Sequence, residues 1–165
     1  MNILEIPELT ENEVLQSYLS FKLDDELFAV EVKKVIEILE VPKITVIPRA
    51  PKYMAGIINL RGKVLPLIDT RIQFGLETIS FTVDTCIVVI EIEIEGEKIE
   101  IGTLVDSVLE VVDIPEDSIL PCRSIEAKYK LDYIKGMFQS ENDFIMLINL
   151  DKVFSIQESD FIQDK

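Results

Sequence analysis

Apolar and polar positions alternate along the first part of this chain, with the period expected of half-buried β-strands. Tyr18–Leu23 and Leu27–Val30 both alternate and are separated by the acidic residues 24–26, so we predict two strands joined by a polar turn. Val32–Leu39 then has apolar residues at 32, 35, 36 and 39, a spacing that fits one face of a short helix. Three prolines between residues 42 and 51 predict an irregular connection.

The second half predicts a further set of elements in a similar order. They are a long strand at Phe81–Ile94, a returning strand at Ile99–Leu104, a helix at residues 105–112, and a last strand pair at Tyr133–Phe138 and Phe144–Leu150. A C-terminal helix is expected from Leu150 onward, and residues 1–16 and 157–165 are expected to be loosely held ends. The chain is therefore predicted to be mainly β, with short helices.

The two halves also match in sequence, which indicates an internal duplication. The matched segments are Val35–Pro42 with Val108–Pro115, at an offset of 73 residues, and Tyr53–Ile57 with Tyr133–Met137 and Leu65–Asp69 with Ile145–Asn149, both at an offset of 80. A unit of this length is too long for a solenoid repeat and suits one small β-barrel per half, so we expect two barrels packed together. Chance matching between β-rich segments is the alternative.

The most informative turn lies in the first half, at Asn59–Lys63. Gly62 supplies the positive φ that several tight turns require, so Arg61 is expected at the tip of a stiff hairpin. At the offset of 80, Arg61 aligns with Glu141 and Gly62 with Asn142, so the tip inverts its charge while the flanking strands match. A turn needed only for folding has no reason to differ in this way. We therefore predict that Arg61 contacts a partner; the alternative is a turn residue with no further role.

Composition narrows the possible functions. The 165 residues, 48% of them apolar, suit one domain or two small lobes that share an interface. A formal net charge of −15 disfavours binding to nucleic acid or to anionic membranes. No apolar run approaches the ~18 residues of a membrane span, the first residues do not resemble a secretory signal, and Cys86 and Cys122 give no disulfide framework. We expect no nucleic-acid partner, no direct membrane insertion, and a reduced cytoplasmic location.

Candidate catalytic and metal-binding groups are few. Histidine is absent, which removes the commonest general base and the commonest metal ligand. Glu91, Glu93 and Glu95 share one face of a strand, where a solvated face is a simpler interpretation than an acid–base pair. Cys86 lies in an apolar strand with no histidine to activate it. We predict no catalytic residue, cofactor or metal. An unrecognised enzyme and a nucleic-acid-binding barrel, which would need basic and aromatic residues on one sheet face, stay as alternatives.

Three motifs follow one another along the chain. They are Phe28-x-Val30-x-x-x-x-Val35-x-Glu37-Ile38, then Gly56-x-x-Asn59-Leu60-Arg61-Gly62-x-x-x-Pro66-x-x-Asp69-x-Arg71, then Val105-Asp106-x-Val108. Together they resemble the CheW family of bacterial chemotaxis coupling proteins, over about residues 18–156, with the central motif the most specific. The resemblance implies a single CheW-like domain, residues 1–165, of two packed SH3-like five-stranded β-barrels. We expect the first lobe at about 18–78 and the second at about 79–150.

The resemblance also implies a function without catalysis. Proteins similar to this one bind the regulatory domain of the chemotaxis histidine kinase and the cytoplasmic tip of chemoreceptors, as adaptors in a two-component system that controls motility. Residues carried over as receptor-binding are Arg61 and Glu37, with Val35, Ile38, Gly56 and Asn59 shaping a groove around them. The kinase-binding residues stay open. The expected location is the cytoplasm, at membrane-associated chemoreceptor arrays.

The predicted helix at Val32–Leu39 has two interpretations. It is either a cap that closes one end of a barrel, with Glu37 in solvent, or one side of a groove in which exposed apolar residues beside Glu37 receive a partner's helix. Periodicity alone leaves both open.

Overall fold

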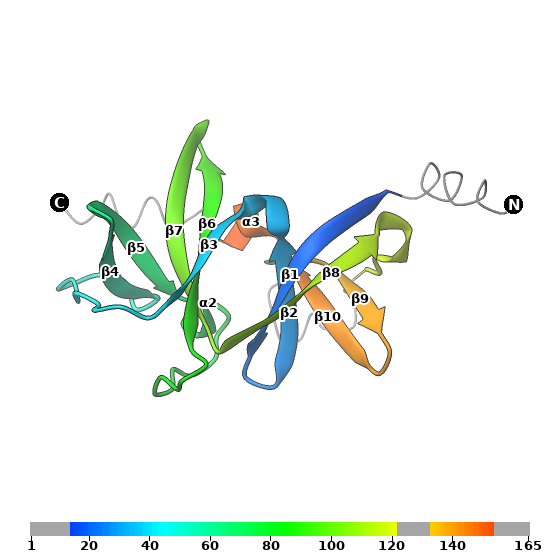
Figure 1. The fold of residues 1–165 in the computed structure, drawn as a ribbon, viewed down its shortest axis with the longest axis horizontal. Helices are drawn as coiled ribbons and strands as arrows, with labels where there is room; N and C mark the ends of the chain where they lie inside the picture. Colours follow the sequence, from blue (N-terminus) through cyan, green and yellow to red (C-terminus); the bar gives the residue numbers. More distant parts are fainter. Residues whose placement is uncertain (1–13, 122–132, 154–165) are drawn as a thin grey trace, which may run out of the picture.

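The computed structural model describes residues 14–121 and 133–153, and its strands form two five-stranded sheets (Figure 1). The order is β8-β1-β2-β10-β9 in one sheet, which we call lobe A, and β3-β6-β7-β5-β4 in the other, lobe B. Figure 1 shows the two lobes next to each other, with α3 between them. The predicted fold class, mainly β with two packed SH3-like five-stranded lobes, is confirmed.

The strands of each lobe come from both halves of the chain. Lobe A contains β1 (Leu15–Leu23), β2 (Glu26–Glu31), β8 (Ser107–Pro115), β9 (Ile134–Ser140) and β10 (Asp143–Ile148). Lobe B contains β3 (Val35–Glu40), β4 (Met54–Leu60), β5 (Lys63–Asp69), β6 (Cys86–Ile94) and β7 (Glu97–Val105). Short helical turns occur at η2 (Val32–Lys34), α2 (Thr70–Gln73), η3 (Glu116–Ser118) and α3 (Leu150–Val153).

The sequential lobe boundaries at 18–78 and 79–150 are therefore wrong. The first half contributes β1 and β2 to lobe A and β3, β4 and β5 to lobe B, and the second half makes the reciprocal contribution. The repeat itself is preserved, because β1 to β5 correspond in order to β6 to β10. When each strand of lobe B is replaced by its counterpart in the other half, the order of lobe B becomes that of lobe A. Chance matching does not produce this correspondence, so the internal duplication is confirmed. The two lobes are joined by an exchange of strands.

The helices predicted at 32–39 and 105–112 are also wrong, because both segments form strands. After the single turn of η2, the chain forms β3, which pairs antiparallel with β6 from Val35–Ile90 to Glu40–Cys86. Residues 107–115 form β8, which pairs with β1. Both segments are rich in β-branched residues, which pack well on a pleated surface, and pairing with a neighbouring strand overrides an apolar spacing that also fits a helix.

Three hydrophobic clusters hold the molecule together. One fills lobe B, around Leu65, Leu67 and Val89, and one fills lobe A, around Tyr18 and Leu147. The largest lies between the lobes and draws on both sheets and on the residues after β5 and β10. Each fully buried aliphatic or aromatic side chain contributes about 1.5–3 kcal/mol relative to exposure. The lobes are therefore parts of one packed unit.

The ends of the chain are described only in part. The strand β1 begins at Leu15, so it takes up the last residues of the arm predicted at 1–16; residues 1–13 lie outside the described part. The helix α3 begins at Leu150 as predicted, and its expected continuation and the end at 157–165 lie outside the described residues. Over 14–121 and 133–153, the structure has no helix long and apolar enough to cross a membrane.

Candidate functional site

The hairpin tip between β4 and β5 has the geometry of a two-residue turn. Leu60 pairs with Lys63 across the hairpin, and the turn residues Arg61 and Gly62 have φ values of 51° and 85°. Positive φ at both positions matches the right-handed twist of the flanking strands, but an arginine adopts it at some cost. The carboxamide Oδ1 of Asn59 accepts a hydrogen bond from the N–H of Gly62 at 2.8 Å and so stabilises the turn. Asn59 therefore positions the tip.

Arg61 is not a lone cation. Its Nη2 lies 2.8 Å from Oε2 of Glu37, with the side chain of Arg61 69% exposed and that of Glu37 27% exposed. Glu37 lies on β3 and Arg61 on the β4–β5 hairpin, at opposite sides of the sheet order of lobe B. The contact therefore requires the sheet to curl, as in a barrel. The sequence predicted both residues for one site, and the structure brings them together.

The strand β3 alternates between buried and exposed side chains. Val35, Glu37 and Leu39 are half-buried on one face, whereas Ile36 and Ile38 are 43% and 46% exposed on the other. Val35 packs against the cluster between the lobes. The groove residues expected around Glu37 therefore point in two directions: Ile38 faces solvent and Val35 faces the core.

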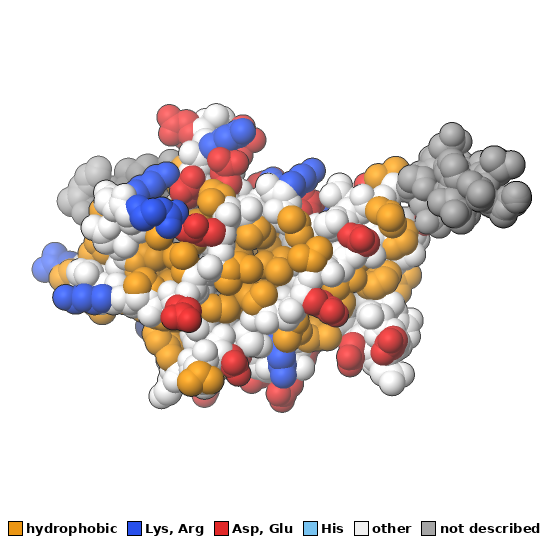
Figure 2. Space-filling model, viewed as in Figure 1, with side chains coloured by type: hydrophobic (Ala, Val, Ile, Leu, Met, Phe, Trp, Pro, Cys, Tyr) orange, Lys and Arg blue, Asp and Glu red, His pale blue; other side chains and the backbone are white. Residues whose placement is uncertain are grey.

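Further apolar residues are exposed on other strands. Val64 on β5 is 61% exposed, and Leu109 and Val111 on β8 are 47% and 57% exposed. Figure 2 shows hydrophobic side chains gathered in a band across one face of the molecule, over β3 and over the crossing of β1 and β8. Exposed apolar patches of this kind mark interaction sites on soluble proteins. Sequence reasoning missed Ile36, Leu109 and Val111 because it predicted helices there. The β-branched residues in both segments are the signal that favours strands.

Gly56 lies beneath the preceding segment and not in an open groove. It is buried with a φ of 151°, and a Cβ at this position would lie 2.4 Å from the carbonyl oxygen of Thr45. Its counterpart Gly136 is equally close to Ile119, at 2.4 Å. Because both halves need glycine for the same close approach, the position of Gly56 supports a role in the scaffold.

The described part of the chain has four two-residue hairpins, which allow a direct comparison of turn residues. The first turn residue has a positive φ in every case: Asp24 at 62°, Arg61 at 51°, Glu95 at 51° and Glu141 at 54°. Three of these residues are acidic and only Arg61 is basic. The backbone geometry therefore does not require arginine at this position, and the charge needs another explanation.

Arg71, the last residue of the central motif, is buried and supports the fold. Its guanidinium is buried and donates to Asp106 through Nε at 3.1 Å, to Asp24 through Nη2 at 3.2 Å and to the carbonyl of Glu77 through Nη1 at 2.6 Å. The hydrogen bond to Asp106 raises the pKa of Arg71 above its usual value. Since Asp24 belongs to lobe A and Arg71 follows β5 of lobe B, this network links the lobes.

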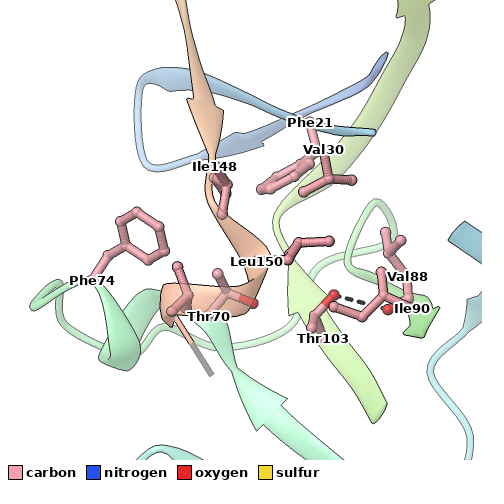
Figure 3. Close-up of a pocket in the computed structure, with 10 residues that line it drawn as sticks. Phe21, Val30, Thr70, Phe74, Val88, Ile90, Thr103, Ile148 and Leu150 are labelled. Carbon is pink, nitrogen blue, oxygen red and sulfur yellow. Dashed lines mark hydrogen bonds between the residues drawn. The ribbon is translucent and has the colours of Figure 1, made fainter. Parts of the chain in front are cut away.

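A small cavity lies between the lobes and offers no room for a substrate. Its volume is about 10 Å³, and Phe21, Val30, Phe74 and Ile148 are among the apolar residues that line it (Figure 3). Thr103 donates to the carbonyl of Val88 at 2.8 Å, while the buried hydroxyl of Thr70 has no hydrogen-bond partner. This volume suits at most a single water molecule.

The described part of the chain gives little support for a metal site or a reactive thiol. Residues 14–121 and 133–153 contain no group of three or more Cys, Asp or Glu side chains placed to hold a metal ion. Burial raises the pKa of the Cys86 thiol, which disfavours the reactive thiolate. Cys122 lies outside the described residues.

Comparison with known proteins identifies similar chains. A family model for the CheW-like domain matches residues 17–158. The chain is 31% identical to the chemotaxis protein CheW of Rhizobium meliloti over 140 residues, which cover 85% of this chain and 88% of that protein. It is 32% identical to the probable chemotaxis protein CheW of Rhizobium etli over 142 residues, covering 86% and 89%. The crystal structure of the scaffolding protein TtCheW from Thermoanaerobacter tengcongensis matches with a TM-score of 0.75 and 33% identity, covering 86% of this chain and 93% of that chain.

Proposed function

Because this chain belongs to the CheW-like family of chemotaxis scaffold proteins, we propose that it is a non-catalytic adaptor that couples chemoreceptors to the chemotaxis histidine kinase. In this role it controls motility through two-component signal transduction. It acts in the cytoplasm, at membrane-associated chemoreceptor arrays. The observation that carries the proposal is that β3 holds Glu37, paired with the exposed Arg61, on one face and the exposed Ile36 and Ile38 on the other.

The geometry suits a helical partner. Ile36 and Ile38 present apolar side chains to solvent, and an amphipathic helix binds such a surface through residues on one of its faces. Arg61 can bond a carboxylate or the carbonyls at a helix C-terminus, where the helix dipole is negative. The tip of a chemoreceptor is a helical bundle, so it offers both kinds of contact.

The ion pair does not prevent this contact. An exposed pair of this type contributes only about 0–1 kcal/mol, so exchanging Glu37 for a partner's carboxylate costs little. A contact of this size is weak alone, and repetition across an array strengthens it by multivalency. The kinase-binding surface is left open.

The test is a reconstitution of this protein with the kinase and a receptor cytoplasmic fragment. Arg61→Glu is expected to retain kinase binding and to lose receptor-dependent activation. Glu141→Lys is the matched control, because it reverses a charge at the equivalent hairpin tip with the same positive φ, and it is expected to activate normally.

A charge exchange separates partner contact from internal support. The double variant Arg61→Glu with Glu37→Arg keeps an ion pair between β3 and the hairpin. If Arg61 contacts the receptor, the exchange stays inactive; if the pair only supports lobe B, the exchange restores activation and the assignment of both residues fails. Normal activation by Arg61→Glu alone also contradicts the assignment.

A further inference from the structure

The segment between Glu40 and Asp69 has a charge opposite to that of the whole chain. It carries five Lys or Arg side chains and no Asp or Glu, so all 31 acidic residues lie outside it. The five are Lys43, Arg49, Lys52, Arg61 and Lys63. All five are exposed to solvent. A chain with a formal net charge of −15 therefore presents one basic segment.

These five side chains lie along one strand at the edge of lobe B. The strand is β4, which comes last in its sheet order, and Thr45 of the β3–β4 connection pairs antiparallel with Ile57 on the side away from β5. Two hydrogen bonds of 2.9 Å make this bridge. Lys52 comes just before β4 and Arg61 just after it, so the cations span roughly 25 Å, at about 3.3 Å per residue. We call this surface the basic strip.

Figure 2 shows Lys and Arg side chains gathered at the end of lobe B where Figure 1 places the β3–β4 connection and the β4–β5 hairpin. The two hairpin cations are paired, at 2.8 Å with Glu37 and at 2.9 Å with Glu100. The other three, Lys43, Arg49 and Lys52, pair with no carboxylate of residues 14–121 and 133–153. The described fold therefore leaves an excess of positive charge on the basic strip.

Arg49 occupies a strained position in the basic strip. The N–H of Ala50 donates to the carbonyl of Ile47 at 3.3 Å and closes a turn in which Pro48 is second and Arg49 third. Arg49 has a φ of 68°, a value that turns of this kind normally assign to Gly or Asn. An arginine there destabilises the fold, and strained residues other than glycine cluster at functional sites. Arg49 therefore has the strain expected of a residue kept for binding.

The basic strip suits a partner surface that is acidic and partly apolar. Val46 and Val64 lie among the cations and are 73% and 61% exposed. A helix of about 17 residues has the length of the strip, at 1.5 Å per residue. Carboxylates at a spacing of i, i+4 lie on one face of such a helix. An acidic amphipathic helix can therefore contact the cations and the two valines together.

An anionic membrane fits this surface less well. A bilayer is an extended plane, and it repels the remainder of a chain whose formal net charge is −15. A helix contacts only the strip itself. Charge complementarity therefore favours a protein helix.

We propose that the basic strip is a docking surface for an acidic helix and that the chemoreceptor tip supplies this helix. This step rests on the proposed function, in which Arg61 contacts the helical bundle of the receptor. Arg61 lies at one end of the strip, and Arg49 and Lys52 continue the contact along β4. The contacting receptor helix therefore carries several carboxylates along one face.

Charge reversal far from the hairpin tests the basic strip in the full chain. Arg49→Glu with Lys52→Glu is expected to weaken binding of the receptor fragment by about tenfold and to retain kinase binding, because charges at an interface steer association. The matched control is Lys98→Glu with Lys152→Glu, which changes the net charge equally at exposed positions outside the strip. The control is expected to bind within about twofold of the wild type. Equal losses in both variants, or no loss in either, overturn the proposal.

A glycine at Arg49 separates binding from folding. Arg49→Gly removes the charge and relieves the positive φ, so it is expected to raise the urea midpoint of unfolding. It is also expected to weaken receptor binding by about threefold. A variant that is less stable than the wild type and binds the receptor normally would show that Arg49 serves the fold, and it would overturn the proposal.

A peptide probe distinguishes failure of the basic strip from failure of the proposed function. A helical peptide of about 17 residues with glutamates along one face is titrated into the full chain, beside the same peptide with glutamines. The glutamate peptide alone is expected to shift the amide NMR signals of Lys43, Arg49 and Lys52. If it does so while the receptor fragment does not bind, the proposed function fails and the strip stands as a site for acidic helices.

Two results of the probe experiments count against the strip. Unchanged amide signals with the glutamate peptide overturn it. Co-sedimentation with phosphatidylserine vesicles that is lost in Arg49→Glu with Lys52→Glu would assign the strip to a membrane and also overturn the proposal.

Discussion

Arg61 and Arg71 flank β5 and both pair with carboxylates, but the side chain of Arg61 is 69% exposed and that of Arg71 is 9% exposed. At the residue scale this difference in burial separates two roles that look alike in the sequence motif. Solvent screens the pair at Arg61 and leaves it free to exchange partners. The guanidinium of Arg71 is out of water, and its carboxylate and carbonyl partners compensate for that loss.

We predict that replacing the two arginines by glutamine separates these roles. Arg71→Gln is expected to lower the free energy of unfolding by about 3–5 kcal/mol, because it breaks a buried ion-pair network. Arg61→Gln is expected to cost no more than about 1 kcal/mol. Urea denaturation of both variants measures the difference. Equal losses would show that burial does not distinguish the two pairs.

A second prediction at this scale concerns pH and the Glu31–Lys135 pair. Burial alone would raise the pKa of Glu31, but the hydrogen bond and charge of Lys135 lower it below the ordinary value of 4.5. A lowered pKa in the folded chain means that the pair stabilises the fold above pH 4.5 and that this contribution is lost as pH falls through the folded-state value. Solvent screening limits it to about 1 kcal/mol.

The pH effect is measured by comparing the wild type with Glu31→Gln in urea at neutral and at acid pH. The wild type is expected to be the more stable at neutral pH, and the difference is expected to shrink in acid. Asn142→Gln, at an exposed turn and without a titratable group, serves as the control and is expected to show no such trend. A difference that grows in acid would contradict the prediction.

At the scale of elements, strands were easier to predict than the segments that follow them. Alternation located β1 and β2, because a half-buried strand leaves a period of two in the sequence, and the turn residue Gly62 located the β4–β5 hairpin. The apolar spacing was misleading at β3, where Val35, Ile36 and Leu39 also fit a helix. Only pairing with β6 decides between helix and strand there. This error concealed the exposed face of Ile36 and Ile38. Motif resemblance, and not periodicity, brought Arg61 and Glu37 into the same predicted site.

The exposed face of β3 leads to a third prediction. Ile38→Lys is expected to change the free energy of unfolding by no more than about 0.5 kcal/mol, because Ile38 is 46% exposed on an edge strand. It is expected to weaken binding of the receptor fragment by about tenfold or more, as at an interface hot spot.

The control for this variant is Phe144→Lys, since Phe144 is 48% exposed on lobe A and corresponds by the repeat to Val64. Receptor binding is measured by titration and stability by urea denaturation. If both variants weaken receptor binding equally, the loss reflects the added charge and not the face of β3.

At the scale of the whole molecule, the sequence revealed the internal duplication but not the exchange of strands between the two lobes. An offset of 73 or 80 residues aligns the halves equally well whether each half forms its own lobe or contributes strands to both. Nothing local distinguishes the two arrangements, because the deciding contacts are non-local ladders such as β1 with β8 and β3 with β6. The fold class was predictable for this reason, and the division into lobes was not.

The exchange of strands between the lobes leads to a last prediction, about how the chain folds. A cut between residues 78 and 79 separates β3 from β6, its only ladder partner in the described sheets, and β8 from β1. Each fragment then holds two incomplete sheets and loses much of the cluster between the lobes. Residues 1–78 and 79–165 are therefore expected to be unfolded when separate and to regain the native spectrum when mixed in equal amounts. Heteronuclear NMR and urea denaturation follow both states, with the uncut chain unfolding in one cooperative transition. A cooperative transition in either fragment alone would mean that a lobe forms within one half, which the observed ladders do not allow.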